Sequence, residues 1–376
     1  MEIYLVGGAV RDQLLGMPIQ DQDWVVVGST IEEMLEKGFK PVGKSFPVFL
    51  HPKTKEEYAL ARTEKKIGQG YHGFVFHADP AVTLEQDLLR RDLTINAMAI
   101  DRLGNLIDPY HGREDLKAGL LRHVSPAFIE DPLRLLRLAR FVAKLNFKVH
   151  ESTLELARSM VRAGEINSLS WDRVSGEFIA GLAGLWAGEM LGFLSSIGLL
   201  EQLFPNLNRV VYRESARLLS FLDSSLVQVL DATDKLAILL IFFLPEDNPA
   251  DFLQSLRLPK RVQQYLLVVQ RIFSAYSQGK TVTAETVLVF LQQVDAFRQP
   301  QRLDKLLKLL PVLLVAKSAS MPILSYDLRG VLEALKGLHW SEQLLKQQGQ
   351  PIAELVRQRQ LKEIERYFQN RFDFFE

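Results

Sequence analysis

The sequence contains no cysteine among its 376 residues. This absence excludes disulfides, thiol nucleophiles, cysteine-ligated zinc and iron–sulfur clusters, and it fits a reducing compartment. An excess of charge of one sign is also missing, because 45 Lys and Arg balance 45 Asp and Glu, so a polyanion-binding surface must come from local clustering of Lys and Arg. The most apolar later stretch, 236–244, is far shorter than the roughly 20 residues of a membrane span. Met1 leads directly into the short apolar run 3–6, so we expect no secretory signal and predict a cytoplasmic location.

The pattern of apolar residues divides the chain into two parts. Over the first ~120 residues, β-branched and aromatic runs at 3–6, 24–27, 48–51 and 58–60 alternate with turns and short amphipathic segments. From Glu130 onward, apolar residues recur at three- and four-residue spacing, which predicts helices, with breaks near 206, 245–249, 299–300 and 311–322. The segment 64–73 carries three glycines and several charges, which is typical of a mobile loop. The sequence therefore predicts an α+β protein with a helical second part.

Two short motifs in the first part suit phosphate and metal chemistry. Gly7 and Gly8 follow a predicted strand and precede an amphipathic run that contains Arg11, so backbone N–H groups at a helix start are expected to meet phosphate. Asp21 and Asp23 precede the next strand, where a period of two places both carboxylates on one face. Such a pair suits a hard divalent cation that also binds substrate phosphates. Each motif alone also fits a simpler structure, a tight turn for the glycines and a solvated acidic turn for the aspartates.

Two arginine-rich segments follow. We expect the run 89–99 to be helical, with Arg90 and Arg91 available for a triphosphate or a nucleotide sugar; the simpler interpretation is intrahelical Arg–Asp pairs, which are common on surfaces. In the segment 130–141, Pro132 suits the first turn of a helix that places Asp131 and Arg134 on one side. Arginines at every third position drift around a helix, so Arg134 and Arg140 are expected to serve different contacts, for example a base and a triphosphate.

Together these motifs resemble a known family. The Gly-Gly-x-Val-Arg-Asp turn, the Asp-x-Asp strand, the Arg-Arg-Asp-Leu-Thr-Ile-Asn-Ala run and the Glu-Asp-x-x-Arg helix occur in the order found in class II tRNA nucleotidyltransferases, and the chain resembles the bacterial CCA-adding enzymes. A segment at 108–116 is similar to that family's connecting motif, so the resemblance covers about residues 3 to 180. It implies a polymerase-β-like nucleotidyltransferase head at 1–120, an all-helical neck with the base-reading helix at 121–205, and a helical body and tail at 206–376 that bind tRNA.

The resemblance also implies roles for individual residues. Asp21 and Asp23 match the catalytic carboxylates that hold two Mg²⁺ ions in a two-metal nucleotidyl transfer. The remaining matches contact the incoming nucleotide: Gly8, Arg11 and Arg91 generally, Arg137 and Arg140 on its phosphate side, and Asp131 and Arg134 at the base. Cytosine and adenine share an amine donor beside a ring-nitrogen acceptor, which an Asp acceptor and an Arg donor complement, whereas guanine and uracil present the reverse pattern. The implied activity is therefore template-independent addition and repair of the tRNA 3′-terminal CCA with CTP and ATP.

The resemblance also implies a segment that switches the added base and a third catalytic carboxylate. The resemblance implies that the segment 63–73 controls the switch from C addition to A addition. This segment is present at full length, which argues against an enzyme that adds only CC. Glu57 is a weak match for a third catalytic carboxylate, Glu56 is nearly as good, and a solvated strand edge is the simpler interpretation of both. The choice between Mg²⁺ and Mn²⁺ and the oligomeric state stay open.

Two rival functions remain at this point. A poly(A) polymerase of the same superfamily shares the metal and Arg-Asp motifs, although the run 96–99 follows the CCA-enzyme form, and a non-catalytic RNA-binding module is the alternative from another class. None of the seven histidines is followed by Asp, so we expect no HD phosphohydrolase domain. The tRNA surface is expected from basic residues of the helical part, none of them specific alone: Arg173, Lys260, Arg261, Arg302, Lys305, Lys308, Arg357, Arg359 and Arg366.

Overall fold

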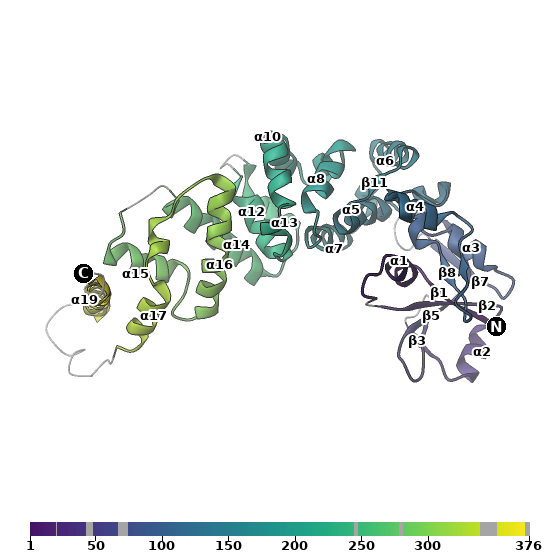
Figure 1. Cartoon of the computed structure of the whole chain (residues 1–376), viewed down its shortest axis with the longest axis horizontal. Helices are drawn as coiled ribbons and strands as arrows, with labels where there is room; N and C mark the ends of the chain where they lie inside the picture. Colours follow the sequence, from purple (N-terminus) through teal and green to yellow (C-terminus); the bar gives the residue numbers. More distant parts are fainter. Residues whose placement is uncertain are drawn as a thin grey trace. The chain divides into compact units, whose positions relative to one another are not determined.

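The computed structural model describes residues 1–19, 21–42, 48–66, 74–243, 247–277, 281–338 and 352–372, without the side chains of 64–66, 74–78 and 370–372. Two compact units make up the chain, Met1–Val211 and Tyr212–Glu376. Among the described residues, no helix combines the length and the apolarity that crossing a bilayer requires. Figure 1 labels many of the elements of both units.

A seven-stranded sheet forms the N-terminal part of the first unit, as the β-branched runs predicted. Its strands lie in the order β3-β4-β5-β2-β1-β8-β9, in which β2 and β5 are parallel and the other neighbours antiparallel. The bounds are β1 (Glu2–Val6), β2 (Asp23–Val27), β3 (Lys40–Val42), β4 (Val48–Leu50), β5 (Glu57–Leu60), β8 (Ala99–Ile100) and β9 (Leu106–Ile107). Helices α1 (Gly8–Leu14), α2 (Ile31–Glu36) and α3 (Leu84–Leu89) accompany the sheet.

The alternation along β2 decides which way its carboxylate faces. Val25 packs with Leu84 and Leu88 of α3 in one core cluster, whereas Val26 packs with Met34 of α2 in the cluster on the other face. Because side chains two positions apart share a face, Asp23 projects on the face of Val25. The strand therefore delivers this carboxylate to the side of the sheet that carries α3.

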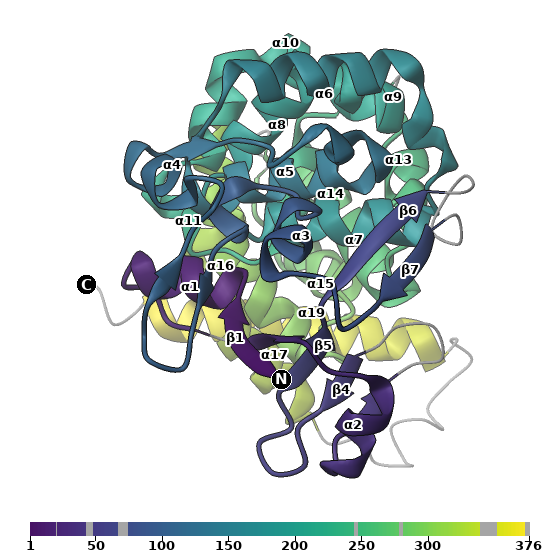
Figure 2. The same cartoon turned by 90° about the vertical axis from the view of Figure 1, so that its right-hand side faces the viewer.

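The predicted loop 64–73 begins with a strand instead. An antiparallel pair joins β6 (Arg62–Lys66) to β7 (Phe74–Ala78), with Arg62 opposite Ala78 and Lys66 opposite Phe74 (Figure 2). The loop prediction is wrong for 64–66, where backbone pairing with a strand eight or more residues later outweighs the local polar pattern. The rest of that segment, 67–73, lies outside the described residues.

The run 89–99 was expected to be helical, and this expectation is wrong. Helix α3 ends at Leu89, and the chain continues through a turn into the 3₁₀ helix η2 (Thr94–Asn96) and strand β8. The Asp92 carboxylate accepts hydrogen bonds from the Leu93 N–H and the Asn96 amide, and Thr94 N–H bonds to the Arg122 carbonyl. These partners replace the helical ones, which is a competition typical of Asp and Asn side chains.

Helices dominate the rest of the first unit, but not completely. The short strands β10 (Leu120–Leu121) and β11 (Lys148–Val149) pair in parallel, so the expectation of an all-helical second part is wrong at 148–149. Asn146 ends the preceding helix in a left-handed conformation, which frees the chain for this pairing. The helices are α4 (Gly112–Ala118), α5 (Leu133–Leu145), α6 (Glu151–Ala163), α7 (Trp171–Leu182), α8 (Ala187–Ser196) and α9 (Leu199–Leu203), with 3₁₀ helices η3 (Pro126–Glu130) and η4 (Glu165–Ser168).

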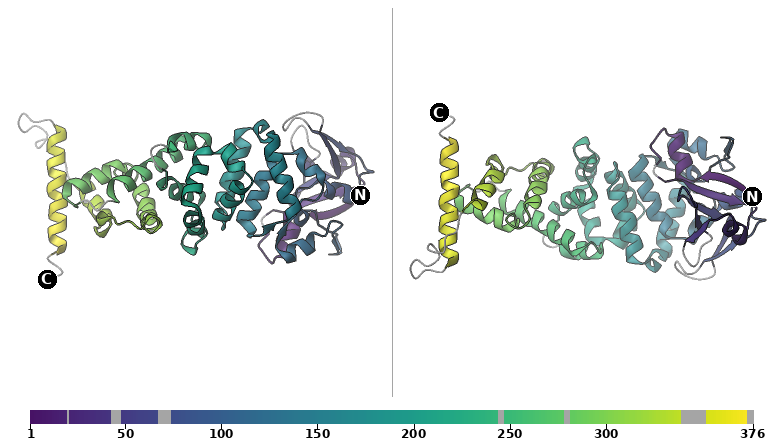
Figure 3. Two further views of the ribbon diagram at one scale, coloured as in Figure 1. Left: turned by 90° about the horizontal axis from the view of Figure 1, so that it is seen from above. Right: turned by 90° about the horizontal axis from the view of Figure 1, so that it is seen from below.

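The second unit is built from helices in the part that the structure describes. Helix α10 (Pro205–Leu222) enters it, and the others are α11 (Ser225–Gln228), α12 (Ala232–Ile241), α13 (Pro249–Ser255), α14 (Lys260–Tyr276), α15 (Ala284–Gln293), α16 (Pro300–Lys317), α17 (Leu328–Lys336) and α19 (Ile352–Phe372), with the 3₁₀ helix η6 (Pro322–Ser325). Helix α14 contacts α12 and α16, and α19 packs against α15 and α17 (Figure 3).

Proline marks one predicted helix boundary in this unit correctly and another wrongly. Pro300 begins α16, as expected from its position, but Pro311 lies inside the same helix rather than at its end. Leu309, Leu310 and Leu313 around it are buried, and this packing offsets the one backbone hydrogen bond that proline cannot make. The proposed division into 1–120, 121–205 and 206–376 stays a prediction.

Candidate active site

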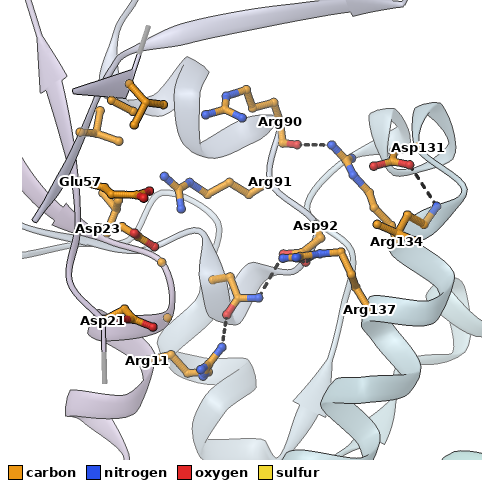
Figure 4. A pocket seen from close by; sticks show the side chains of 18 of the residues that line it. Arg11, Asp21, Asp23, Glu57, Arg90, Arg91, Asp92, Asp131, Arg134 and Arg137 are labelled. Carbon is orange, nitrogen blue, oxygen red and sulfur yellow. Dashed lines mark hydrogen bonds and ion pairs between the residues drawn. The ribbon is translucent and has the colours of Figure 1, made fainter. Parts of the chain in front are cut away.

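A cleft of about 700 Å³ in the first unit brings together residues from α1, β2, β5, α5 and α7. All nine site residues that the sequence singled out line this cleft, together with Glu57: Gly8, Arg11, Asp21, Asp23, Arg91, Asp131, Arg134, Arg137 and Arg140. Figure 4 shows the carboxylates of Asp21, Asp23 and Glu57 on one side, and those of Asp92 and Asp131 on the other, beside Arg137 and Arg134. Residues more than 100 positions apart in sequence therefore share one concave surface.

The acidic side consists of Asp21, Asp23 and Glu57. Asp23 opens β2 and Glu57 opens β5, and the parallel register places them directly opposite each other. The cleft walls partly desolvate the Asp23 carboxyl, which raises its pKa; Arg91 opposes this rise and Asp21 adds to it. Glu56, the alternative to Glu57, accepts a hydrogen bond from Thr54 and does not line the cleft. The structure thus favours Glu57 over Glu56 as a neighbour of the aspartates.

The donor set on this side suits a divalent cation only in part. Asp21 and Asp23 offer hard oxygen ligands, and the raised pKa of Asp23 reflects a carboxylate that a cation would stabilise. Within the described ranges, no group of three or more His, Asp or Glu side chains could hold a metal ion. A cation here therefore needs further oxygen ligands from substrate or water, which is how Mg²⁺ commonly binds beside phosphates.

Arg91 approaches the acidic side across a glycine. It points toward Asp23 and Glu57 in Figure 4, while its Nη2 donates to Asp87 at 3.2 Å. Burial would raise the pKa of Asp87, but the charges of Arg90 and Arg91 lower it. Gly7 has φ +72°, which a residue with a Cβ rarely adopts, and a Cβ there would lie 2.9 Å from Arg91 Nη1, so a substitution would strain the turn and displace the Arg91 guanidinium.

The basic side is braced by a chain of buried and partly buried hydrogen bonds. Arg11 is only 4% exposed; its Nη1 donates to Asn96 Oδ1 at 2.6 Å and its Nε donates to Asp12. The Asn96 amide donates in turn to Asp92 Oδ1, and Asp92 Oδ2 accepts from Arg137 Nε at 2.9 Å (Figure 4). Arg11 of α1 and Arg137 of α5 are thereby held at a fixed separation.

Asp131 and Arg134 are each held in place by separate partners. Asp131 Oδ1 accepts from the Leu133 N–H at 3.0 Å, and Oδ2 accepts from Arg173 Nη2 at 3.3 Å. Arg134 donates to the carbonyls of Ala127 and Arg90. The two side chains therefore enter the cleft already oriented, by the backbone and by α7.

Arg140 makes a different set of contacts. Its Nε donates to Glu177 of α7 at 2.6 Å, and its guanidinium lies 5.1 Å from the centre of the Phe141 ring. Arg134 and Arg140 thus bind different groups, as the drift of their helix positions predicted.

Comparisons with known proteins identify this arrangement. The family model described as "Poly A polymerase head domain" matches residues 3–122. The CCA-adding enzyme of Pseudomonas putida strain W619 is 42% identical over 98% of this chain and 99% of its own length. The chain belongs to the CCA-adding enzymes, the class II tRNA nucleotidyltransferases.

Two further matches agree with this membership. The multifunctional CCA protein of Neisseria meningitidis serogroup A is 46% identical over 80% of this chain and 79% of its own. The crystal structure of the Bacillus stearothermophilus CCA-adding enzyme in complex with CTP has a TM-score of 0.71 at 24% identity and covers 95% of this chain and 87% of that one. The predicted polymerase-β-like head with a largely helical remainder is thereby confirmed.

Sequence reasoning missed several residues of this CCA-adding enzyme's cleft. Asp92 and Asn96 stood within a recognised motif, but their function as a brace between Arg11 and Arg137 was not inferred. Arg173 was grouped with surface RNA-binding residues, whereas it lines the cleft and contacts Asp131. Glu177, four positions after Arg173, gave no signal of its own.

Proposed function

We propose that this CCA-adding enzyme completes and repairs tRNA 3′ ends with CTP and ATP by a two-metal transfer in the cleft of the first unit. The observation that carries the proposal is the juxtaposition of Asp21 and Asp23 with Asp131 and Arg134 in one cleft. One pair supplies ligands for catalytic cations, and the other supplies a carboxylate and a guanidinium that can hydrogen-bond with a nucleotide base. Asp131 and Arg134 would therefore select the incoming nucleotide without a template strand.

Asp21 and Asp23 would hold the Mg²⁺ ions. Bound there, Mg²⁺ would supply charge neutralisation at the attacking 3′-hydroxyl and at the triphosphate during an in-line displacement that releases diphosphate. Glu57 adds a third negative charge beside Asp23 and strengthens the attraction for cations. The family generally uses a divalent metal, and the oxygen-only donor set favours Mg²⁺ or Mn²⁺.

The arginines orient the triphosphate. Arg11 and Arg137 keep a fixed separation through Asn96 and Asp92, so the positive charge stands ready before the nucleotide arrives. Arg91, Arg140 and the backbone N–H of Gly8 at the start of α1 complete the contacts that we assign to the nucleotide. Their role is positioning and electrostatic stabilisation, which account for most of the catalysis in phosphoryl transfer.

Asp131 and Arg134 select the base. Each carboxylate oxygen accepts more than one hydrogen bond, so Asp131 keeps acceptor capacity for an exocyclic amine although Leu133 and Arg173 already contact it. Arg134 donates to the neighbouring ring nitrogen. Guanine or uracil would face these groups with the wrong polarity, and each hydrogen bond lost in this way would cost about 1–3 kcal/mol.

The order of addition requires that the base pocket change after the second C. We assign this change to the segment 63–73, which begins in β6 and continues beyond the described residues. Its full length in this sequence is the reason to expect complete CCA addition rather than CC addition alone. The absence of cysteine is consistent with work in the cytoplasm, where tRNA is the substrate.

An incorporation assay tests the proposal directly. A tRNA transcript that lacks its last three nucleotides is incubated with CTP, ATP and Mg²⁺, and the products are resolved at single-nucleotide length. We expect C, C and A in that order and then a stop. A long A tract would instead support a poly(A) polymerase, the activity named in the matching head-domain family. No metal-dependent incorporation at all would leave only an RNA-binding role.

A further inference from the structure

Phe141 is an aromatic residue of the catalytic cleft to which the proposed function gives no task. It follows Arg140 directly in α5, and it lines the cleft although its side chain is only 4% exposed. The proposed function uses the arginine alone. The contacts of the ring show what the phenylalanine contributes.

Two guanidinium groups lie over the Phe141 ring. The Cζ atoms of Arg11 and Arg140 are each 5.1 Å from its centre, so these two atoms are no more than twice that distance apart. The face of an aromatic ring carries negative charge density, which attracts a guanidinium most strongly where water is excluded. Arg11 and Phe141 are both buried, so water screens their attraction little. The ring therefore offsets part of the repulsion between the two like charges.

Hydrogen bonds fix one edge of each guanidinium and leave other donors for a ligand. Arg11 Nε and Nη2 lie 2.8 and 2.7 Å from Asp12 Oδ1, and Arg140 Nε donates to Glu177 at 2.6 Å. Among the described residues, the contacts of Arg140 leave its terminal N–H groups for a ligand. A Cβ on Gly8 would lie 3.5 Å from Arg11 Nη2, so this end of Arg11 lies beside the start of α1, where we assign a phosphate.

An ion pair joins α1 and α5 close to the ring. Lys144 of α5 comes about one helical turn after Phe141, and its Nζ lies 3.0 Å from Asp12 Oδ2. Asp12 follows Arg11 in α1, so a charge pair and the contact of Arg11 with the ring connect the same two helices. The ring thus lies at the junction that sets the distance between Arg11 and Arg140.

We propose that Phe141 is a positioning residue for the triphosphate. Its ring sets the spacing and the direction of Arg11 and Arg140, so that both reach phosphate groups of one nucleotide. In this role Phe141 acts through the two arginines and not on the reacting atoms. The inference rests on the proposed function, because that function assigns the triphosphate to these arginines. It predicts that the ring affects the binding of phosphate and not the choice of base.

Fluorinated phenylalanines test the ring without removing it. Suppression of an amber codon at position 141 of the full-length enzyme introduces mono-, di- and trifluorinated phenylalanine, which draw electron density from the ring face step by step and nearly keep its shape. Phe141→Leu removes the ring altogether. Trifluorinated phenylalanine at Phe49 is the matched control, because Phe49 is also buried but belongs to the core cluster on the other face of the sheet and does not line the cleft.

Inorganic tripolyphosphate is the first probe, because it carries phosphate charge without a base, and CTP and ATP are the next. We expect its dissociation constant to rise with each fluorine, by about threefold for the trifluorinated ring, and by about tenfold in Phe141→Leu. KM for CTP and KM for ATP should rise by the same factors, with a smaller change in kcat. The midpoint of thermal unfolding should stay constant along the fluorinated series, because packing is retained.

Three results would overturn the proposal. A dissociation constant that does not change along the fluorinated series would mean that the ring serves packing alone, whatever the effect of Phe141→Leu. An equal loss of affinity in the Phe49 control would show an effect on the whole domain. A rise in KM for CTP and ATP without a change for tripolyphosphate would mean that the ring meets the base instead of orienting the arginines.

Incorporation by the unmodified enzyme separates these results from a failure of the proposed function. If the unmodified enzyme adds C, C and A while the fluorinated series shows no change, the role of Phe141 alone is wrong. If the unmodified enzyme adds no nucleotide, the function itself fails, whatever the ring does to the binding of tripolyphosphate.

Discussion

Asp92→Asn is the substitution whose effect the structure defines most closely. The Asp92 carboxylate accepts from the Leu93 N–H, from the Asn96 amide and from Arg137, whose Nε and Nη2 lie 2.9 and 2.8 Å from Oδ2. Asparagine has one acceptor oxygen instead of two. Its own amide would therefore face either the Asn96 amide or the Arg137 guanidinium, and both of these are donors.

The pKa of Asp92 gives the size of the effect. Burial alone would raise it, but the charge of Arg137 and the hydrogen bonds from Asn96, Arg137 and Leu93 lower it from 3.8 to about 2. A lowered carboxyl pKa contributes stability that is complete above 3.8 and is lost as the pH falls through about 2. The difference is worth about 2 to 3 kcal/mol, and Asp92→Asn should remove it at every pH above 4.

Urea unfolding followed by tryptophan fluorescence measures this loss, because Trp24, Trp171 and Trp186 all lie in the first unit. We expect the variant to be less stable by the same amount at pH 7.5 and at pH 5.5. Glu155→Gln, on an exposed position of α6, serves as control and should change stability by less than about 0.5 kcal/mol. A loss under about 0.5 kcal/mol in Asp92→Asn, or a loss that shrinks between pH 7.5 and 5.5, would refute the reasoning.

Three further predictions concern the chemistry. Asp131→Ala should relax base selection, so that the preference for CTP over UTP falls about tenfold or more; unchanged discrimination would count against the base-reading assignment. Deletion of residues 65–70 should stop synthesis after CC, and normal terminal A incorporation would argue that the segment plays no part in switching. Because the pKa of Asp23 is raised, its carboxylate is protonated at a higher pH than an ordinary aspartate. Activity should therefore fall early on acidification and recover with excess Mg²⁺, and a profile insensitive to metal concentration would contradict this.

Local patterns in the sequence were sufficient for much of the fold. Runs of β-branched and aromatic residues located β1, β2, β4 and β5, and the three- and four-residue spacing from Glu130 onward predicted the helical part. Both signals depend on residues a few positions apart, so one sequence contains them. They also placed Asp21 and Asp23 at the start of a strand.

The errors occurred where distant contacts override local preference. Residues 89–99 form a turn and a 3₁₀ helix because Asp92, Asn96 and Arg122 offer other hydrogen-bond partners. Strand β11 exists because β10, 28 positions earlier, pairs with it. Pro311 stays inside α16 because neighbouring leucines are buried in the core. Such partners are not visible in the local pattern of a single sequence.

In the site, too, the sequence predicted the local motifs but not the contacts between distant residues. Family motifs identified the residues that line the cleft, but they did not identify the hydrogen-bond partners that fix these side chains. Asn96 meets Arg11 across 85 positions, and Arg173 meets Asp131 across 42. These contacts decide whether a side chain is preorganised, and they follow from the packing of α1 and α7 rather than from any spacing in the sequence.

Crystals grown with CTP and Mn²⁺ would test the central claim most directly, because anomalous scattering locates the cation independently of the protein. We predict Mn²⁺ beside the Asp21 and Asp23 carboxylates, with the cytosine amine on Asp131 and its ring nitrogen on Arg134. A cation bound elsewhere, or a base turned away from Asp131 and Arg134, would contradict the account.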